Sequence, residues 1–113
     1  MELHYTSHKV SDNLILTLHN EIINFEVTTT IKDIMLLEVH GGCHNVVLDL
    51  NSVRYMDSSG LGVLLFGKRL TGDNEGNLCL VGVAAPIQFM LSIAKLLNVF
   101  RIYDTVEDAL KSL

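Results

Sequence analysis

Two adjacent serines stand where the chain changes from a loop to a helix, in the stretch "RYMDSSGLGVLLF" at residues 54–66. Ser and Asp side chains favour helix starts, because their oxygens accept hydrogen bonds from free backbone N–H groups. We therefore expect Asp57 or Ser58 to cap the helix that follows. A hydroxyl at an accessible helix start is also a target for phosphorylation, which adds roughly −1.5 to −2 of charge.

The residues after the serines predict a surface that another molecule can approach. Gly60 and Gly62 fall in the first turn of the expected helix, where each costs about 1 kcal/mol relative to Ala. The run from Leu61 to Phe66 is apolar nearly all round that helix, so we expect an aliphatic side chain near its start to remain exposed. A hydroxyl, small residues and an exposed aliphatic group together indicate a docking surface.

A second group of reactive side chains, "HGGCH" at residues 40–44, has the residue types of a zinc site. Zinc needs a full set of convergent ligands, and His4, His8 and His19 lie elsewhere with no matching motif. "HGG" also resembles an esterase oxyanion motif, but the chain has no Gly-x-Ser-x-Gly elbow. We therefore expect no metal, no cofactor and no catalysis, with His40 instead opposing the dipole of a helix C-terminus.

The composition favours one domain over residues 1–113 and excludes several classes of protein. The net charge is −5 and the largest basic cluster is Lys68-Arg69, which disfavours direct binding of nucleic acid. No apolar run reaches the length of about 18 residues that a membrane span needs. The first ten residues lack the pattern of a secretory signal, so we expect a cytoplasmic protein with Cys43 and Cys79 reduced.

The hydropathy pattern predicts strands and helices in the order β-β-α-β-α-β-α-β-α, which is an α/β fold. The expected strands are 2–8, 14–18, 45–50, 78–83 and 100–103, and the expected helices are 28–42, 58–70, one opened by Pro86 and one capped by Thr105 with Asp108. We expect a Thr30–Asp33 capping box, a left-handed stop at Gly41, and Gly72 beyond the end of its helix. The first two strands can pair antiparallel, which makes the sheet mixed.

Residues 46–65, "VVLDLNSVRYMDSSGLGVLL", closely resemble the signature of the STAS domain of bacterial anti-sigma factor antagonists. In that family a Val-Leu-Asp-Leu strand leads to a hydrophobic-Met-Asp-Ser-Ser/Thr/Ala-Gly-Leu-Gly segment. The chain length, the order of elements, "LVGV" at 80–83 and "YDTVEDAL" at 103–110 extend the resemblance over essentially the whole chain. It implies a single STAS-type domain with a mixed, mostly parallel sheet of about five strands covered by about four helices.

What this resemblance implies is a switch. Family members bind an anti-sigma factor that is also a serine kinase, and this binding frees the sigma factor. The kinase phosphorylates the Ser directly after the Asp, here Ser58, the phosphorylated form no longer binds, and a phosphatase restores it. ATP and magnesium would come from the partner. The implied contact surface comprises Asp57, Ser58, Ser59, Gly60, Leu61 and Gly62, with Asn20, Glu21 and Asn24 as a second edge.

One stretch departs from the family pattern. Many relatives carry Gly-Glu-Leu-Asp just after the second strand, where this chain has "NEII" at residues 20–23. The Asp of that motif lies in the surface that meets the kinase, and Ile23 replaces it, with Asn24 one place later. This leaves open a scaffold or accessory subunit of a signalling assembly or lipid-transport ATPase, or a binder of small anions. The retained pair Asp57-Ser58 favours the switch.

Overall fold

The computed structural model describes all residues, 1–113, and a five-stranded sheet in the order β1-β2-β4-β6-β7 forms its centre. The strands of this sheet are β1 (Tyr5–Val10), β2 (Asn13–Leu18), β4 (Asn45–Asp49), β6 (Leu78–Val81) and β7 (Arg101–Tyr103). The helices are α1 (Phe25–His40), α2 (Ser58–Asp73), α3 (Ala85–Ile93) and α4 (Val106–Lys111), with a short 3-10 helix at Leu97–Val99. Two further strands of two residues, β3 (Ile22–Ile23) and β5 (Tyr55–Met56), pair parallel with each other.

The prediction of an α/β fold with a mixed, mostly parallel sheet and four helices is confirmed. β1 and β2 are antiparallel, and each of the other pairs in the central sheet is parallel. This arrangement follows from the sequence, because the short turn between β1 and β2 allows a hairpin, whereas parallel neighbours need a helical crossover. β4 and β6 lie in the middle of the sheet and are apolar on both faces, as strands covered on both sides must be.

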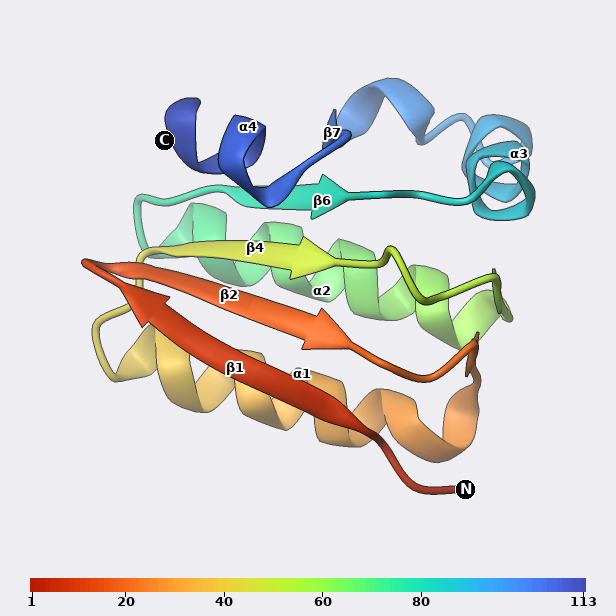
Figure 1. Cartoon of the computed structure of the whole chain (residues 1–113), viewed down its shortest axis with the longest axis horizontal. Helices are drawn as coiled ribbons and strands as arrows, with labels where there is room; N and C mark the ends of the chain where they lie inside the picture. Colours follow the sequence, from red (N-terminus) through yellow and green to blue (C-terminus); the bar gives the residue numbers. More distant parts are fainter.

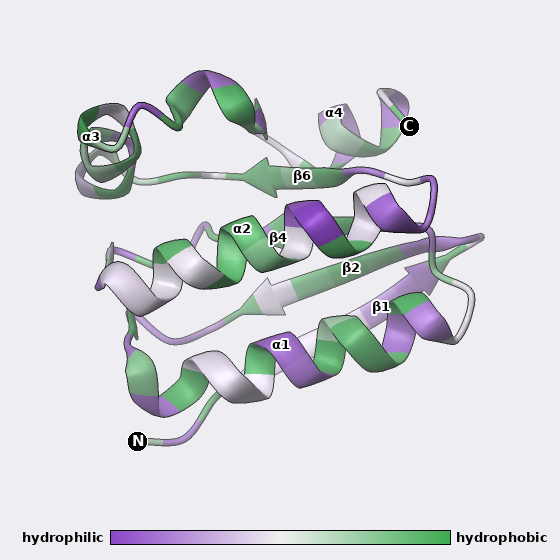
Figure 2. Ribbon diagram, turned by 180° about the vertical axis from the view of Figure 1, so that it is seen from behind, coloured by the Kyte–Doolittle hydropathy of each residue, from purple (hydrophilic) through white to green (hydrophobic).

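Helices α1 and α2 lie side by side on one face of the sheet (Figure 2) and bury the larger core against it. Helix α4 lies on the other face, where Ala109 packs with Val47, Cys79 and Val81 in a smaller cluster. The starts of α1 and α2 and the whole of α3 gather at one end of the molecule, at the right of Figure 1. In a parallel sheet this end collects the loops that follow the strands, so it is where a site is expected.

The start of α1 differs from the prediction. The helix begins at Phe25 rather than near residue 28, and its N-cap is Asn24, whose side chain accepts a hydrogen bond of 2.9 Å from the backbone N–H of Glu26. The proposed capping box of Thr30 and Asp33 is therefore wrong, since both lie inside the helix. Asn is as good a cap as Thr, and the pattern of three consecutive threonines obscured the true boundary.

The structure also differs from the prediction at the two helix ends where we expected glycines. Gly41 is the C-cap of α1 but has a right-handed φ of −82°, and the left-handed residue is Gly42, with a φ of +117°. Gly72 lies within the last turn of α2, which continues to Asp73 and is capped by Asn74. The tolerance of a helix for a glycine near its end explains this error, because one such residue costs only about 1 kcal/mol.

The other end signals are confirmed. Pro86 lies in the first turn of α3, and the Thr105 hydroxyl accepts a hydrogen bond of 3.1 Å from the backbone N–H of Asp108 at the start of α4. Cys43 and Cys79 are both free and buried, and they belong to the two different cores on opposite faces of the sheet. None of the helices has the length and hydropathy that crossing a membrane would need.

Candidate functional site

The carboxylate of Asp57 joins the starts of two helices. Its Oδ1 accepts hydrogen bonds from the backbone N–H of Ser59 at 2.9 Å and of Gly60 at 3.3 Å, so Asp57 and not Ser58 is the N-cap of α2. Its Oδ2 accepts one of 3.3 Å from the backbone N–H of Phe25, the first residue of α1. A hydrogen bond from the Ser59 hydroxyl, together with those from the backbone, lowers the pKa of Asp57. The carboxylate is therefore ionised at neutral pH.

The two serines have different environments. The Ser59 hydroxyl donates a hydrogen bond of 2.5 Å to Oδ1 of Asp57, and the residue is half-buried. Ser58 is the first residue of α2, its side chain is exposed, and it is not engaged with Asp57. One serine thus belongs to the capping network, while the other presents its hydroxyl to solvent.

The short strands β3 and β5 bring the second predicted edge beside this helix start. Ile22 pairs with Tyr55 and Ile23 with Met56, and the backbone N–H of Asp57 donates to the carbonyl of Ile23 at 3.2 Å. This pairing holds residues 21–23 against the loop that leads to Ser58. The hydropathy pattern did not predict these two strands, because two residues are too few to show the alternation that predicts a strand.

The alternation of these strands decides which side chains the site can use. Ile23 and Met56 point into the core and are 1% and 3% exposed, whereas Ile22 and Tyr55 point outward. Ile23, which replaces the family's Asp in the predicted register, is thus a core residue. The polar side chain that follows Ile23 is that of Asn24, the N-cap of α1.

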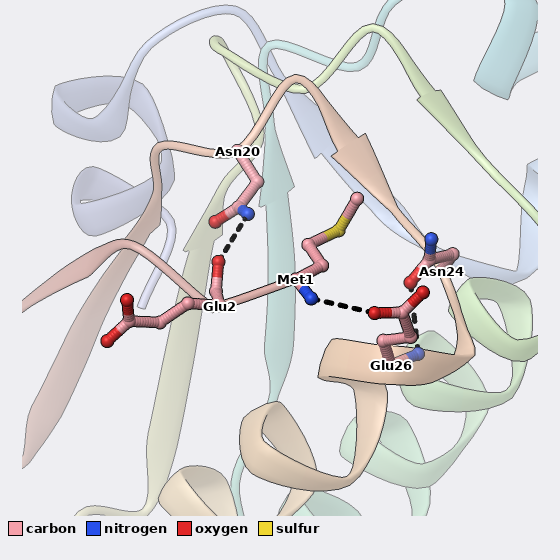
Figure 3. Close-up of polar contacts among 5 residues, drawn as sticks. All are labelled: Met1, Glu2, Asn20, Asn24 and Glu26. Carbon is pink, nitrogen blue, oxygen red and sulfur yellow. Dashed lines mark hydrogen bonds and ion pairs between the residues drawn. The ribbon is translucent and has the colours of Figure 1, made fainter.

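The side chain of Asn20 forms hydrogen bonds with other residues of the chain, one of which is drawn in Figure 3. Its amide donates a hydrogen bond of 2.9 Å to the carbonyl of Glu2, and its Oδ1 accepts one of 2.7 Å from the backbone N–H of His4. The amino group of Met1 lies 2.8 Å from the carboxylate of Glu26 in the first turn of α1. Asn20 therefore holds the first residues beside the site, whereas Glu21 is exposed.

The two glycines of α2 serve different surfaces. A Cβ on Gly60 would lie 2.7 Å from the Cβ of Met56, so the space beside Gly60 is filled by the chain itself. A Cβ on Gly62 would meet nothing within 4 Å, and Gly62 borders a shallow hollow of about 220 Å³ on the outer side of α2. Leu61, between them, is half-buried against the main core. Of the two glycines, Gly62 is the one that leaves α2 open to another molecule.

The arrangement supports binding through the surface around Ser58. Glu21 and Asp57 contribute negative charge at this end, the carboxylate of Glu26 is paired with the amino group of Met1, and Arg54 is the nearest cation along the chain. The "HGGCH" cluster lies at the other end of α1 from this surface, and no three His, Cys, Asp or Glu side chains in the structure converge as metal ligands would.

Residues 5–109 match the family model of the STAS domain. The chain belongs to the STAS domain family. This match extends from the first strand to α4 and includes every element that builds the surface around Ser58.

Two relatives carry related names. The anti-sigma F factor antagonist of Paenibacillus polymyxa is 35% identical over 71 residues, which make up 63% of this chain and 61% of that protein. The crystal structure of TM1081 from Thermotoga maritima, a candidate anti-sigma factor antagonist, has a TM-score of 0.88 and 27% identity, and covers 96% of this chain and 92% of that one. The chain thus spans less than two thirds of the first relative and nearly all of the second.

The anti-sigma factor antagonist SpoIIAA has been solved in its unphosphorylated form and, from Bacillus, in its phosphorylated form. The two structures superpose on this chain with TM-scores of 0.83 and 0.76, at 16% identity each. Both cover 96% of this chain, and the covered parts make up 95% and 98% of their own chains. At this identity the likeness shows a shared fold alone.

Proposed function

We propose that this chain is an anti-sigma factor antagonist, which in its unphosphorylated form binds an anti-sigma factor with serine kinase activity and so releases a sigma factor. Phosphorylation of Ser58 ends the binding, and a phosphatase restores it. The observation that carries this proposal is the exposed Ser58 hydroxyl beside an Asp57–Ser59 cap, in a chain similar to proteins named as anti-sigma factor antagonists. The chain acts in the cytoplasm by binding, and catalysis belongs to its partners.

The electrostatics around Ser58 explain how a phosphate would act. The N–H groups of Ser59 and Gly60, which could neutralise an anion at this helix start, are already bound by Asp57. A phosphate on Ser58 therefore meets the negative charge of Asp57 instead of free donors. In an interface such an unpaired charge costs several kcal/mol, which is enough to dissociate a complex.

The exposure of Ser58 also means that the fold itself can accommodate the phosphate. The side chain lies outside both cores, so the added group enters solvent rather than displacing packed atoms. The existence of SpoIIAA in a phosphorylated form with the same fold supports this expectation.

The test measures binding and phosphorylation separately. Each anti-sigma factor encoded by the source organism is purified and titrated against wild type, Ser58→Ala, Ser58→Asp and the matched control Ser59→Ala. We expect wild type and Ser58→Ala to bind one of them, and Ser58→Asp to bind at least about a hundredfold more weakly. With ATP and magnesium, that partner should phosphorylate wild type and Ser59→Ala but not Ser58→Ala. Equal binding of wild type and Ser58→Asp would contradict the switch.

The alternative function is that of a scaffold or accessory subunit, and one observation favours it. At position 23, where the predicted register places the carboxylate that meets the kinase, this chain has a buried isoleucine. In that case wild-type and Ser58→Asp baits should recover the same partners from native lysate, namely a transporter ATPase or other STAS subunits. Ser58 would then have no regulatory part.

A further inference from the structure

Helix α3 exposes two large apolar side chains that the core does not use. Ile87 and Leu91 are buried, whereas Phe89 and Ile93 are 68% and 67% exposed. Residues four apart are neighbours on a helix surface, so Phe89 and Ile93 form one apolar face. The nine residues of α3 include no charged side chain, which is unusual for a helix that remains in contact with water.

This face lies at the same end of the molecule as Ser58. Helix α3 packs against β5, the strand that leads directly into Asp57 and Ser58. Figures 1 and 2 show α3 at the same end of the molecule as the starts of α1 and α2, with the start of α2 between α3 and the start of α1. A partner that covers Ser58 is therefore within reach of α3.

Further apolar side chains are exposed on the neighbouring elements β3 and β5 and at the start of α1. Ile22 and Tyr55 pair across β3 and β5 and are 46% and 57% exposed, and Phe25, whose backbone N–H binds Asp57, is 70% exposed. Single exposed apolar residues are common, but several exposed aromatic and aliphatic side chains at one end of a molecule mark an interaction surface. We call these five residues, Ile22, Phe25, Tyr55, Phe89 and Ile93, the apolar rim.

The charge of the chain indicates what covers the apolar rim. Carboxylates at Glu21 and Asp57 and cations at Arg54 and Lys95 adjoin the rim, and Glu26 is paired with the amino group of Met1. The chain as a whole carries −5, so a second copy would bring together two molecules of the same net charge, which is unfavourable for association. A partner with an apolar surface and a net positive charge would complement both the rim and the charge of the chain.

We propose that the exposed face of α3 is the second half of the surface that binds the anti-sigma partner, with Phe89 and Ile93 as apolar anchors. This inference rests on the proposed function and adds to it the part of the fold that supplies affinity independently of phosphorylation. The partner presents an apolar patch and carries a net positive charge. Ser58 decides whether the complex forms, and the apolar rim decides how tightly it holds.

The experiment compares two double variants of matched chemistry. Phe89→Gln with Ile93→Gln removes the α3 face. Leu36→Gln with Leu37→Gln is the control, because these residues are 38% and 72% exposed on α1, with Leu37 about 18 Å along the helix from Phe25. Both variants should have a melting temperature close to that of wild type, since the changed side chains are outside the core. Affinity for the purified anti-sigma factor is measured by calorimetry at low and high salt.

We expect the α3 variant to bind about tenfold to a hundredfold more weakly and the α1 control to bind like wild type. Binding of wild type should also weaken as salt is raised, because the attraction between the acidic chain and a cationic partner is screened. If the α3 variant binds normally while Ser58→Asp does not, the proposed function stands and this inference fails. If no anti-sigma factor binds wild type, both fail. If the α3 variant instead abolishes a dimer seen by light scattering, the occupant is a second copy and the inference is wrong.

Discussion

A single carboxylate, that of Asp57, organises the surface around Ser58. It caps α2, engages the Ser59 hydroxyl and reaches the first N–H group of α1. By occupying these donors it leaves Ser58 as the one free hydroxyl of the motif. The difference between the two serines therefore follows from their positions relative to the cap, since Asp57 engages the residue two places after it.

The first prediction concerns the pH dependence of this cap. The pKa of Asp57 lies below its usual 3.8, since the Ser59 hydroxyl and backbone N–H groups stabilise the ionised form. Its contribution to stability is present above the unfolded pKa and is lost as pH falls through the lowered folded pKa. The urea midpoints of wild type and Asp57→Asn should therefore differ by a constant amount from neutral pH to about pH 4. Below about pH 4 the difference between the two midpoints should become smaller. A gap that stays unchanged in acid would show that the charge of Asp57 is not what stabilises the cap.

The second prediction tests which residue takes the place of the family's Asp. Ile23 is 1% exposed, so Ile23→Asp buries an unpaired carboxylate and should destabilise the fold by more than about 3 kcal/mol. Asn24→Asp exchanges one good N-cap for another and should change stability by less than about 1 kcal/mol. Urea denaturation of both variants gives the answer. A well-folded Ile23→Asp variant would mean that the packing of β3 differs from that described.

At the scale of elements, the sequence predicted the central sheet and the four helices, because their apolar patterns are long enough to be unambiguous. It failed where a few polar residues decide a boundary. Asn24 begins α1 before the first apolar turn, and Gly72 lies inside α2 although it resembles a stop. The pairing of β3 with β5 was beyond prediction, since it depends on a contact between two loops that only the folded sheet brings together.

The third prediction uses the two glycines of α2 as a matched pair. Gly60→Ala would place a Cβ 2.7 Å from the Cβ of Met56 and should destabilise the protein by about 1–3 kcal/mol, despite the better helix propensity of Ala. Gly62→Ala meets nothing within 4 Å and should stabilise it by up to about 1 kcal/mol. Thermal unfolding of both variants checks the opposite signs. Equal effects would contradict the close approach of β5 to α2.

At the scale of the molecule, the starts of α1 and α2 and the whole of α3 lie at one end, where we propose that the partner binds. The motif at residues 54–62 predicted the capped start of α2 at this end, because Asp, Ser and Gly have defined preferences at a helix start. The sequence did not predict the role of Asn20 in holding the first residues, nor the exposure of Phe25, Phe89 and Ile93. A pattern of apolar residues shows that a helix has an apolar face, but which face the core covers is settled only by packing.

The last prediction asks whether a negative charge at Ser58 acts locally or on the whole fold. Cys43 and Cys79 lie in the two cores on opposite faces of the sheet, and burial raises the pKa of both thiols, which keeps them protonated and unreactive. Because Ser58 lies outside both cores, Ser58→Asp should leave both thiols as resistant to maleimide as in wild type. Its free energy of unfolding should change by less than about 0.5 kcal/mol.

The labelling is followed by mass spectrometry at several urea concentrations. The control is Ile23→Ala, which leaves a cavity in the core and should lower the free energy of unfolding by about 2–5 kcal/mol. In that control Cys43, which shares the core of Ile23, should label at lower urea than in wild type. Faster labelling of Cys43 or Cys79 in Ser58→Asp would mean that the charge loosens the packed sheet. Loss of partner binding in that variant would then follow from partial unfolding, and the surface around Ser58 would not be a local switch.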